Sequence, residues 1–116
     1  MISHVVLFRA KGDLSDAERD ALIAAFEHAV HEIPTVRSVR VGRRLMFGAG
    51  YEKNASDRVE FLITIDFDDV VGLQTYLEHP AHVELGERFN RACAMAMVFD
   101  FAVTPGVSDV RGLLTS

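Results

Sequence analysis

What this chain of 116 residues lacks narrows its class before any motif is considered. Its one cysteine, Cys93, cannot form an internal disulfide or a cysteine-based metal cluster. No apolar run reaches the roughly 18 residues that a membrane-spanning helix needs. The N-terminus also lacks the basic region and the cleavage site of a signal peptide. We therefore expect a soluble, cytoplasmic protein that has no membrane partner.

Positive charge is scarce as well. The chain has 12 Lys and Arg residues against 17 Asp and Glu residues, and its formal net charge is −5. A charge of this sign argues against nucleic acid or an anionic lipid surface as the partner. The hydrophobic fraction of 49% and the charged fraction of 25% are ordinary for a globular domain. The composition therefore indicates one globular domain with no nucleic-acid partner.

Hydrophobic patterns with periods of two and 3.6 residues divide the chain into strands and helices. Ser15 begins a capping box that starts the first helix, and Pro34 ends that helix. Pro80 breaks a second helix and can open a third. The predicted elements are a strand over 2–9, a helix over 16–33, a strand over 35–44, a connection over 45–57, a strand over 58–67, a helix capped by Asp68 or Asp69, a short helix over 80–91 and a strand over 94–103.

This βαββαβ order fits an α+β ferredoxin-like sandwich, in which two helices cover one face of a four-stranded antiparallel sheet. A monomer would leave the second, apolar face of the sheet in water. Because burial is worth ~25 cal/mol per Å² of apolar area, we expect a homodimer that packs sheet against sheet. The residues expected on this second face are Phe61, Ile63 and Phe67 or their neighbours, together with Met95, Met97, Phe99 and Phe101.

Several short motifs along the chain match one known family. The most specific is a Tyr-x-x-His-Pro-x-His string that runs from Tyr76 to His82. The weaker ones are His4 before a hydrophobic strand, Ile33-Pro34, Gly42, Gly50-Tyr51 and Phe99-Asp100-Phe101. On these residues, the chain resembles the stress-responsive A/B barrel domain family over residues 1–103. The resemblance implies a dimeric α+β barrel and leaves residues 104–116 as a C-terminal extension.

The same resemblance implies two functions, and both stay open. The family includes a plant polyketide cyclase in which a tyrosine and a histidine, matched here by Tyr76 and His82, serve an aldol-type ring closure. It also includes stress proteins with no assigned reaction. The chain is thus either a cofactor-free cyclase, isomerase or lyase for a polyketide-like or other enolisable carbonyl compound, or a non-catalytic dimer that is stress-responsive or binds a hydrophobic small molecule. A third hypothesis is a cofactor-free or haem-type oxygenase, as in other dimeric α+β barrel families. Those families commonly use a tryptophan in the pocket, and this chain has none, which counts against an oxygenase.

Tyr76 and His82 are the predicted catalytic residues. A neutral imidazole is a suitable base for the proton next to a carbonyl group. His82 follows Pro80 in the first turn of a helix, where the helix dipole favours the neutral form. The phenol of Tyr76 can donate a hydrogen bond to an oxygen that becomes an enolate. The alternative is that both side chains only bond to the backbone at a helix junction.

A second set of residues is predicted to bind the substrate. His4 shares a strand face with Phe8 and would be a polar group in an apolar pocket; alternatively it makes one structural hydrogen bond. His79 either reaches the pocket with Tyr76 or simply ends its helix. The full predicted set is His4, His79, Phe8, Phe61 and Met97. We predict no metal, because no carboxylate accompanies the histidines at a diagnostic spacing. We predict no cofactor, because proton removal next to a carbonyl group needs none.

Two further features have more than one interpretation. Four arginines cluster at positions 37, 40, 43 and 44. They either bind a substrate carboxylate or phosphate, or protect a solvated edge strand from aggregation. The extension after residue 103 carries four apolar side chains, so we expect it to pack on its own subunit or on the partner. These side chains are Val107, Val110, Leu113 and Leu114.

Overall fold

The structure is a computed structural model that describes residues 1–115, so residue 116 of the predicted extension lies outside the described residues. It contains the predicted βαββαβ order and two short additions, a 3₁₀ helix in the long connection and a helix in the extension. The elements are β1 (Ile2–Ala10), α1 (Asp16–Glu32), β2 (Ser38–Arg43), η1 (Gly50–Asn54), β3 (Phe61–Phe67), α2 (Val70–Glu78), α3 (Pro80–Ala92), β4 (Cys93–Ala102) and α4 (Asp109–Thr115).

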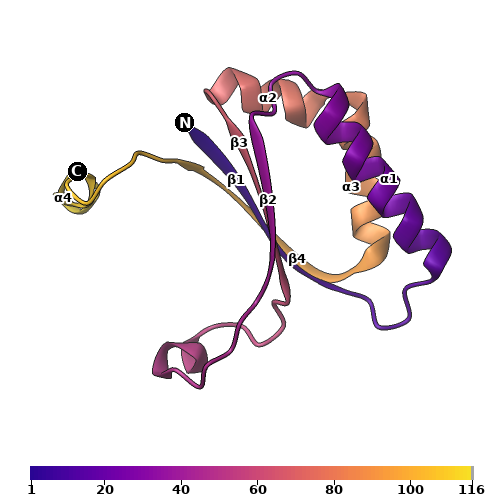
Figure 1. The fold of residues 1–116 in the computed structure, drawn as a ribbon, viewed down its shortest axis with the longest axis horizontal. Coiled ribbons are helices and arrows are strands. Elements are labelled where there is room, and N and C mark those ends of the chain that lie inside the picture. Colours follow the sequence, from indigo (N-terminus) through magenta and orange to yellow (C-terminus); the bar gives the residue numbers. More distant parts are fainter. Residues whose placement is uncertain (116) are drawn as a thin grey trace.

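The four strands form one sheet in the order β2-β3-β1-β4, and all neighbours are antiparallel. Helices α1, α2 and α3 lie on one side of this sheet, and the other side carries no helix packed on it (Figure 1). The predicted ferredoxin-like α+β fold is therefore confirmed. No helix within residues 1–115 combines the length and the apolar character that crossing a bilayer requires.

Short-range signals set the helix ends. The hydroxyl of Ser15 accepts a hydrogen bond from the backbone N–H of Glu18 at 3.1 Å, so α1 begins where the capping box predicts. Of the two candidates for the next cap, Asp69 is the one used: its carboxylate accepts from the N–H of Gly72 at 2.8 Å. Strands β2 and β3 are shorter than predicted, because pairing between them begins at Ser38 and ends at Phe61.

The pairing register corrects the predicted composition of the second sheet face. Phe61, Ile63 and Phe67 stand opposite Phe8, Val6 and Ile2, and these residues point toward the helices. Their neighbours point the other way, because successive side chains of a strand alternate between its faces. The face without helices is therefore formed by Val5, Leu7, Leu62, Thr64, Met95, Met97, Phe99 and Phe101. We call this set the open face.

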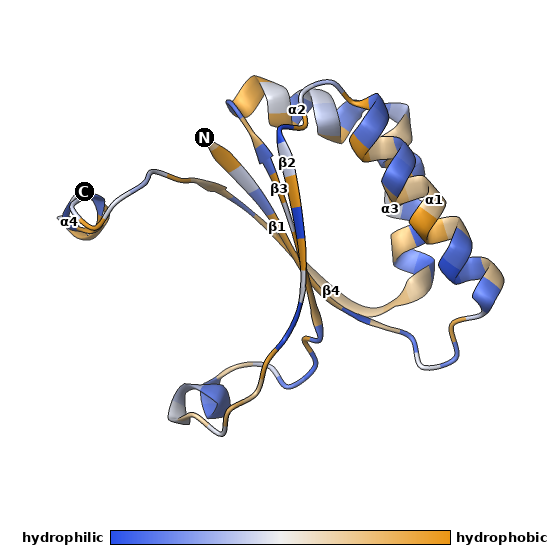
Figure 2. Ribbon diagram, viewed as in Figure 1, coloured by the Kyte–Doolittle hydropathy of each residue, from blue (hydrophilic) through white to orange (hydrophobic). Residues whose placement is uncertain are grey.

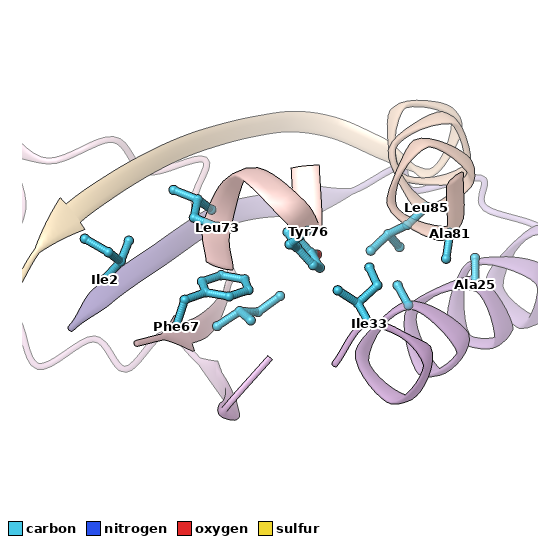
Figure 3. Packing of buried hydrophobic residues seen from close by; sticks show 10 residues of the cluster. Ile2, Ala25, Ile33, Phe67, Leu73, Tyr76, Ala81 and Leu85 are labelled. Atoms are coloured by element: carbon cyan, nitrogen blue, oxygen red, sulfur yellow. The ribbon is translucent and has the colours of Figure 1, made fainter. Parts of the chain in front are cut away.

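The core lies between the helices and the covered face of the sheet, which is the face opposite the open face. Phe67 and Tyr76 are almost completely buried there, together with Ile33 and Leu85 (Figure 3). The helices carry both hydrophobic and hydrophilic positions, whereas hydrophobic residues run along much of β1 and β4 (Figure 2). This difference is expected for helices that bury one face and for strands that present apolar groups on two faces.

The extension does not pack on the body of its own subunit. Helix α4 projects from the end of β4 on the side opposite the helices, and the connection that contains η1 also projects to that side (Figure 1). Val107 is 90% exposed and Leu114 is 81% exposed. The first of the two expected positions for the extension is therefore wrong for this chain, and packing on a partner stays a prediction.

Candidate functional site

A cavity of about 820 Å³ lies between the helical layer and the covered face of the sheet. Most of its wall is apolar, with a few polar groups, which is the usual composition of a small-molecule site. Helix α1 packs alongside α3 and supplies one side of the cavity. The apolar lining residues include Val6, Phe8, Phe61, Ile63, Leu22, Phe26, Leu85 and Phe89. The volume is sufficient for a ligand of drug-like size.

Three of the predicted polar residues meet at this cavity. The ring of Tyr76 lies between two histidine rings, with centroids 5.7 Å from His4 and 4.6 Å from His82. All three side chains line the cavity. They come from β1, the last turn of α2 and the first turn of α3, so residues far apart in the sequence are brought together only by the fold.

The junction of α2 and α3 positions two of these groups. His79 ends α2 and caps α3, because its Nδ1 accepts a hydrogen bond from the N–H of Ala81 at 3.0 Å. Pro80 occupies the first turn of α3, where its missing N–H costs nothing. The chain therefore turns sharply between Tyr76 and His82, and the two rings face each other across the junction.

Asp100 is a site residue that the sequence analysis missed. Its carboxylate lies 2.5 Å from Nδ1 of His4, and β4 pairs with β1 so that the two residues stand opposite each other. An ionised carboxylate can only accept a hydrogen bond, so Nδ1 of His4 is the donor to Asp100. The signal in the sequence was a lone acid in the apolar strand 93–102. Its partner depends on the strand register, which the sequence alone does not show.

The tautomer of His82 is fixed by a backbone carbonyl. Its Nδ1 donates to the backbone carbonyl of Leu77 at 3.1 Å, which leaves Nε2 unprotonated. Burial lowers the pKa of His82 below its usual value, the nearby His4 lowers it further, and the bond to Leu77 opposes this shift. The neutral imidazole is therefore the stable form at neutral pH, and Nε2 is available as a base.

We expect this shift to be measurable as a pH dependence of stability. A folded-state pKa below the usual 6.5 means that folding disfavours the protonated imidazole. The stability that neutral His82 contributes to the fold is fully present above the unfolded-state pKa and is lost as the pH falls through the folded-state pKa. In His82→Asn, whose amide can still donate to Leu77, the free energy of unfolding should fall less between about pH 7 and pH 5 than in the wild type. Equal pH slopes in urea denaturation would contradict the assignment.

Tyr76 is suited to donating a hydrogen bond. Burial raises the pKa of its phenol to about 12, so the group stays protonated throughout the neutral range. Within residues 1–115, the hydroxyl of Tyr76 makes no hydrogen bond to the protein. Its oxygen atom is also not fully enclosed by protein atoms. The hydroxyl is therefore open to the cavity that the ring lines.

The remaining predicted residues are divided between the two sides of the sheet. Phe8 and Phe61 line the cavity, and their ring centroids are 5.4 Å apart. Met97 stands opposite Leu7 on the open face, so the sheet separates it from this cavity. His79 is occupied as a helix cap and is not part of the lining. Within residues 1–115, no three His, Cys, Asp or Glu side chains gather as a metal-binding group.

Known proteins with a similar sequence or fold cover most of this chain. The chain is 22% identical over 100 residues to olivetolic acid cyclase from Cannabis sativa, covering 86% of this chain and 94% of the cyclase. It superposes on hydroxynitrile lyase from Passiflora edulis with a TM-score of 0.74 and 20% identity, covering 91% of this chain and 95% of the lyase.

A second similar structure is a dimeric ferredoxin-like protein from Jannaschia sp. CCS1, with a TM-score of 0.70 and 22% identity; the match covers 88% of this chain and 98% of that protein. The family model of the stress responsive A/B barrel domain matches residues 2–103, which include β1 to β4 and all the cavity-lining groups discussed above. The chain therefore belongs to the stress responsive A/B barrel domain family.

Proposed function

We propose that this protein catalyses proton transfer next to a carbonyl group of an apolar small molecule, as a cyclase, isomerase or lyase that needs no cofactor. One observation carries the proposal: in an apolar cavity, a protonated phenol lies between two histidine rings, and one of them, His82, has an unprotonated Nε2. A base and a hydrogen-bond donor in one apolar space are the groups that enolisation requires.

In the proposed reaction, Nε2 of His82 removes the proton from the carbon next to the carbonyl. The electron pair of the broken C–H bond forms the enolate, whose oxygen accepts a hydrogen bond from the hydroxyl of Tyr76. The enolate carbon then attacks a second carbonyl, expels a leaving group or takes a proton at another position. The proton on His82 returns to the product, so the protein ends each cycle unchanged.

His4 has a supporting role in this proposal. Asp100 anchors the Nδ1 side of its ring, which directs Nε2 away from Asp100. From there Nε2 of His4 can form a hydrogen bond with a polar group of the substrate and orient it. His4 is only 5% exposed, so the interaction would take place in a low-dielectric environment where a hydrogen bond is strong. Asp100 is therefore a positioning residue and His4 a substrate-binding residue.

A homodimer is part of the proposal. The open face carries Phe99 and Phe101, which are 47% and 51% exposed with rings 6.3 Å apart. Helix α4 and the connection with η1 project on the side where a second sheet would pack (Figure 1). Similar structures are described as dimeric. These observations support sheet-to-sheet packing of two copies.

A second candidate is a non-catalytic protein that binds a hydrophobic small molecule. The burial of Tyr76 favours it, since the side chain is 1% exposed and belongs to the packed core. In this candidate, the same cavity holds a ligand, and the histidines only satisfy its polar atoms. The two candidates differ in whether a C–H bond of the ligand breaks.

Hydrogen exchange of ligands in D₂O separates the two candidates. The full chain would be incubated with three probe classes, namely long-chain methyl ketones, aldehydes and β-keto thioesters, and loss of the proton next to the carbonyl would be followed by NMR. We expect exchange above the buffer rate for at least one class. Calorimetric binding of these probes without any accelerated exchange would favour the second candidate instead.

A further inference from the structure

A single cation lines the cavity at a distance from the histidines. Arg43 lies at the end of β2, and its guanidinium carbon is 5.0 Å from the centroid of the Phe61 ring. Because Arg43 stands opposite Phe61, its side chain is on the covered face of the sheet, and it contributes to the cavity wall. Stacking on an aromatic face holds a guanidinium plane while leaving its N–H groups free to bind.

The other three arginines of the cluster have different surroundings. Arg37 forms an ion pair with Asp68 at 2.8 Å. Arg44 donates to the backbone carbonyl of Ser56. Arg40 is three positions from Arg43 on the same strand, so its side chain is on the open face. Of these four arginines, Arg43 is the one that lines the cavity, and it also borders a smaller hollow beside Arg44.

Arg43 has no acidic partner within residues 1–115. Glu27 of α1 also lines the cavity, but it forms no ion pair with Arg43. Exposed lining residues on both elements, Ile23 at 47% and Val41 at 69%, indicate that the cavity opens between α1 and β2. Arg43 is thus an unpaired cation at the mouth of an apolar cavity.

The pairing register of β2, β3 and β1 gives the approximate separation between Arg43 and His4. Arg43 is level with Phe8, and His4 is four residues from Phe8 along β1. Four residues span roughly 14 Å, and the two strand spacings from β2 to β1 add about 10 Å across the sheet. A ligand that touched both ends would therefore be elongated, with an apolar middle part against Phe8, Phe61 and Ile63.

We propose that Arg43 binds an anionic oxygen group, a carboxylate or a phosphate, at the tail of an elongated apolar ligand whose other end reaches Tyr76. The idea that this other end reacts rests on the proposed function, whereas the anion site does not depend on it. A guanidinium fork binds carboxylate and phosphate oxygens through charge-assisted hydrogen bonds. The ligand class is thus an amphipathic acid or phosphate ester.

Calorimetry with three probes of equal chain length tests the site: decanoate, decyl phosphate and decan-1-ol. We expect the wild type to bind at least one of the two anions more tightly than the alcohol. Arg43→Met should weaken binding of that anion about tenfold, because an exposed charge-assisted bond is worth the lower part of its usual range. Binding of decan-1-ol should stay within experimental error. The stronger of the two anions identifies the headgroup.

Arg40→Met is the matched control, because it removes the same charge from the same strand on the opposite face. An equal loss of anion binding in both variants would show that only the net charge of the protein matters, and it would refute the anion site at Arg43. Equal affinity of the wild type for the alcohol and for both anions would also overturn it, as would no binding of any probe. Unchanged anion binding in His82→Asn, together with lost exchange activity, would show that the anion site and the reaction are separate properties.

Discussion

His82→Ala is expected to slow proton exchange of an accepted carbonyl compound by 10²–10⁴-fold, since that is the usual loss when a general base is removed. The structural reason is that Nδ1 of His82 is occupied by Leu77 and the lowered pKa keeps Nε2 unprotonated. Tyr76→Phe should lose less, because the base remains and only the stabilisation of the enolate oxygen is removed. The measurement is the rate of exchange in D₂O by NMR.

Two further variants make this result specific. His28→Ala changes an exposed histidine on α1 and should exchange at the wild-type rate. Asp100→Asn should raise the KM more than it lowers kcat, because it removes the carboxylate that holds the ring of His4, the proposed substrate-binding residue. Wild-type rates in both His82→Ala and Tyr76→Phe would place the reaction elsewhere. If only variants with lowered melting temperatures lost rate, the loss would be explained by reduced stability and not by a catalytic role.

Phe99→Glu is expected to convert the proposed homodimer into monomers at micromolar concentration. The substitution introduces a carboxylate into the open face of each copy, where it would be buried without a partner in a sheet-to-sheet interface. An unpaired buried charge costs ~3–5 kcal/mol, which corresponds to a loss of affinity of at least roughly a hundredfold. Sedimentation equilibrium of wild type and variant measures the change directly.

The control for this variant is Val71→Glu. Val71 is an equally apolar residue on α2, 67% exposed, on the helical side of the sheet. It introduces the same charge away from the proposed interface, so the protein should remain dimeric with an unchanged melting temperature. A wild type that sediments as a monomer would refute the dimer outright. A dimer that survives Phe99→Glu would place the interface on another surface.

Much of the fold was predictable because its signals are local. The cap at Ser15, the break at Pro80 and the alternation of apolar residues in the strands all act within a few residues of each other. These signals can be identified in the sequence because they do not depend on residues far away in the chain. The exact lengths of β2 and β3 were not predictable, because pairing with a neighbour decides where a strand begins and ends.

The candidate site was predictable only in part. Its local features could be predicted, whereas those that depend on strand pairing could not. Tyr76 and His82 lie in one short motif, so the helix junction that faces their rings toward each other is a local feature. Asp100 was missed because it meets His4 across 96 positions, through the pairing of β1 with β4. Met97 was predicted among the cavity residues because alternation sorts side chains into two sets without saying which set faces the helices.

The sequence by itself therefore determined the order of the elements, the ends of the helices and the Tyr76–His82 junction, since these depend on backbone preferences and contacts between near neighbours. The tertiary structure alone decided which face each strand turns to the helices, which acid meets His4, and which arginine reaches the cavity. The physical reason is that side-chain alternation has a period of two, so one step in strand register exchanges the faces. That register is chosen by packing between segments far apart in the chain.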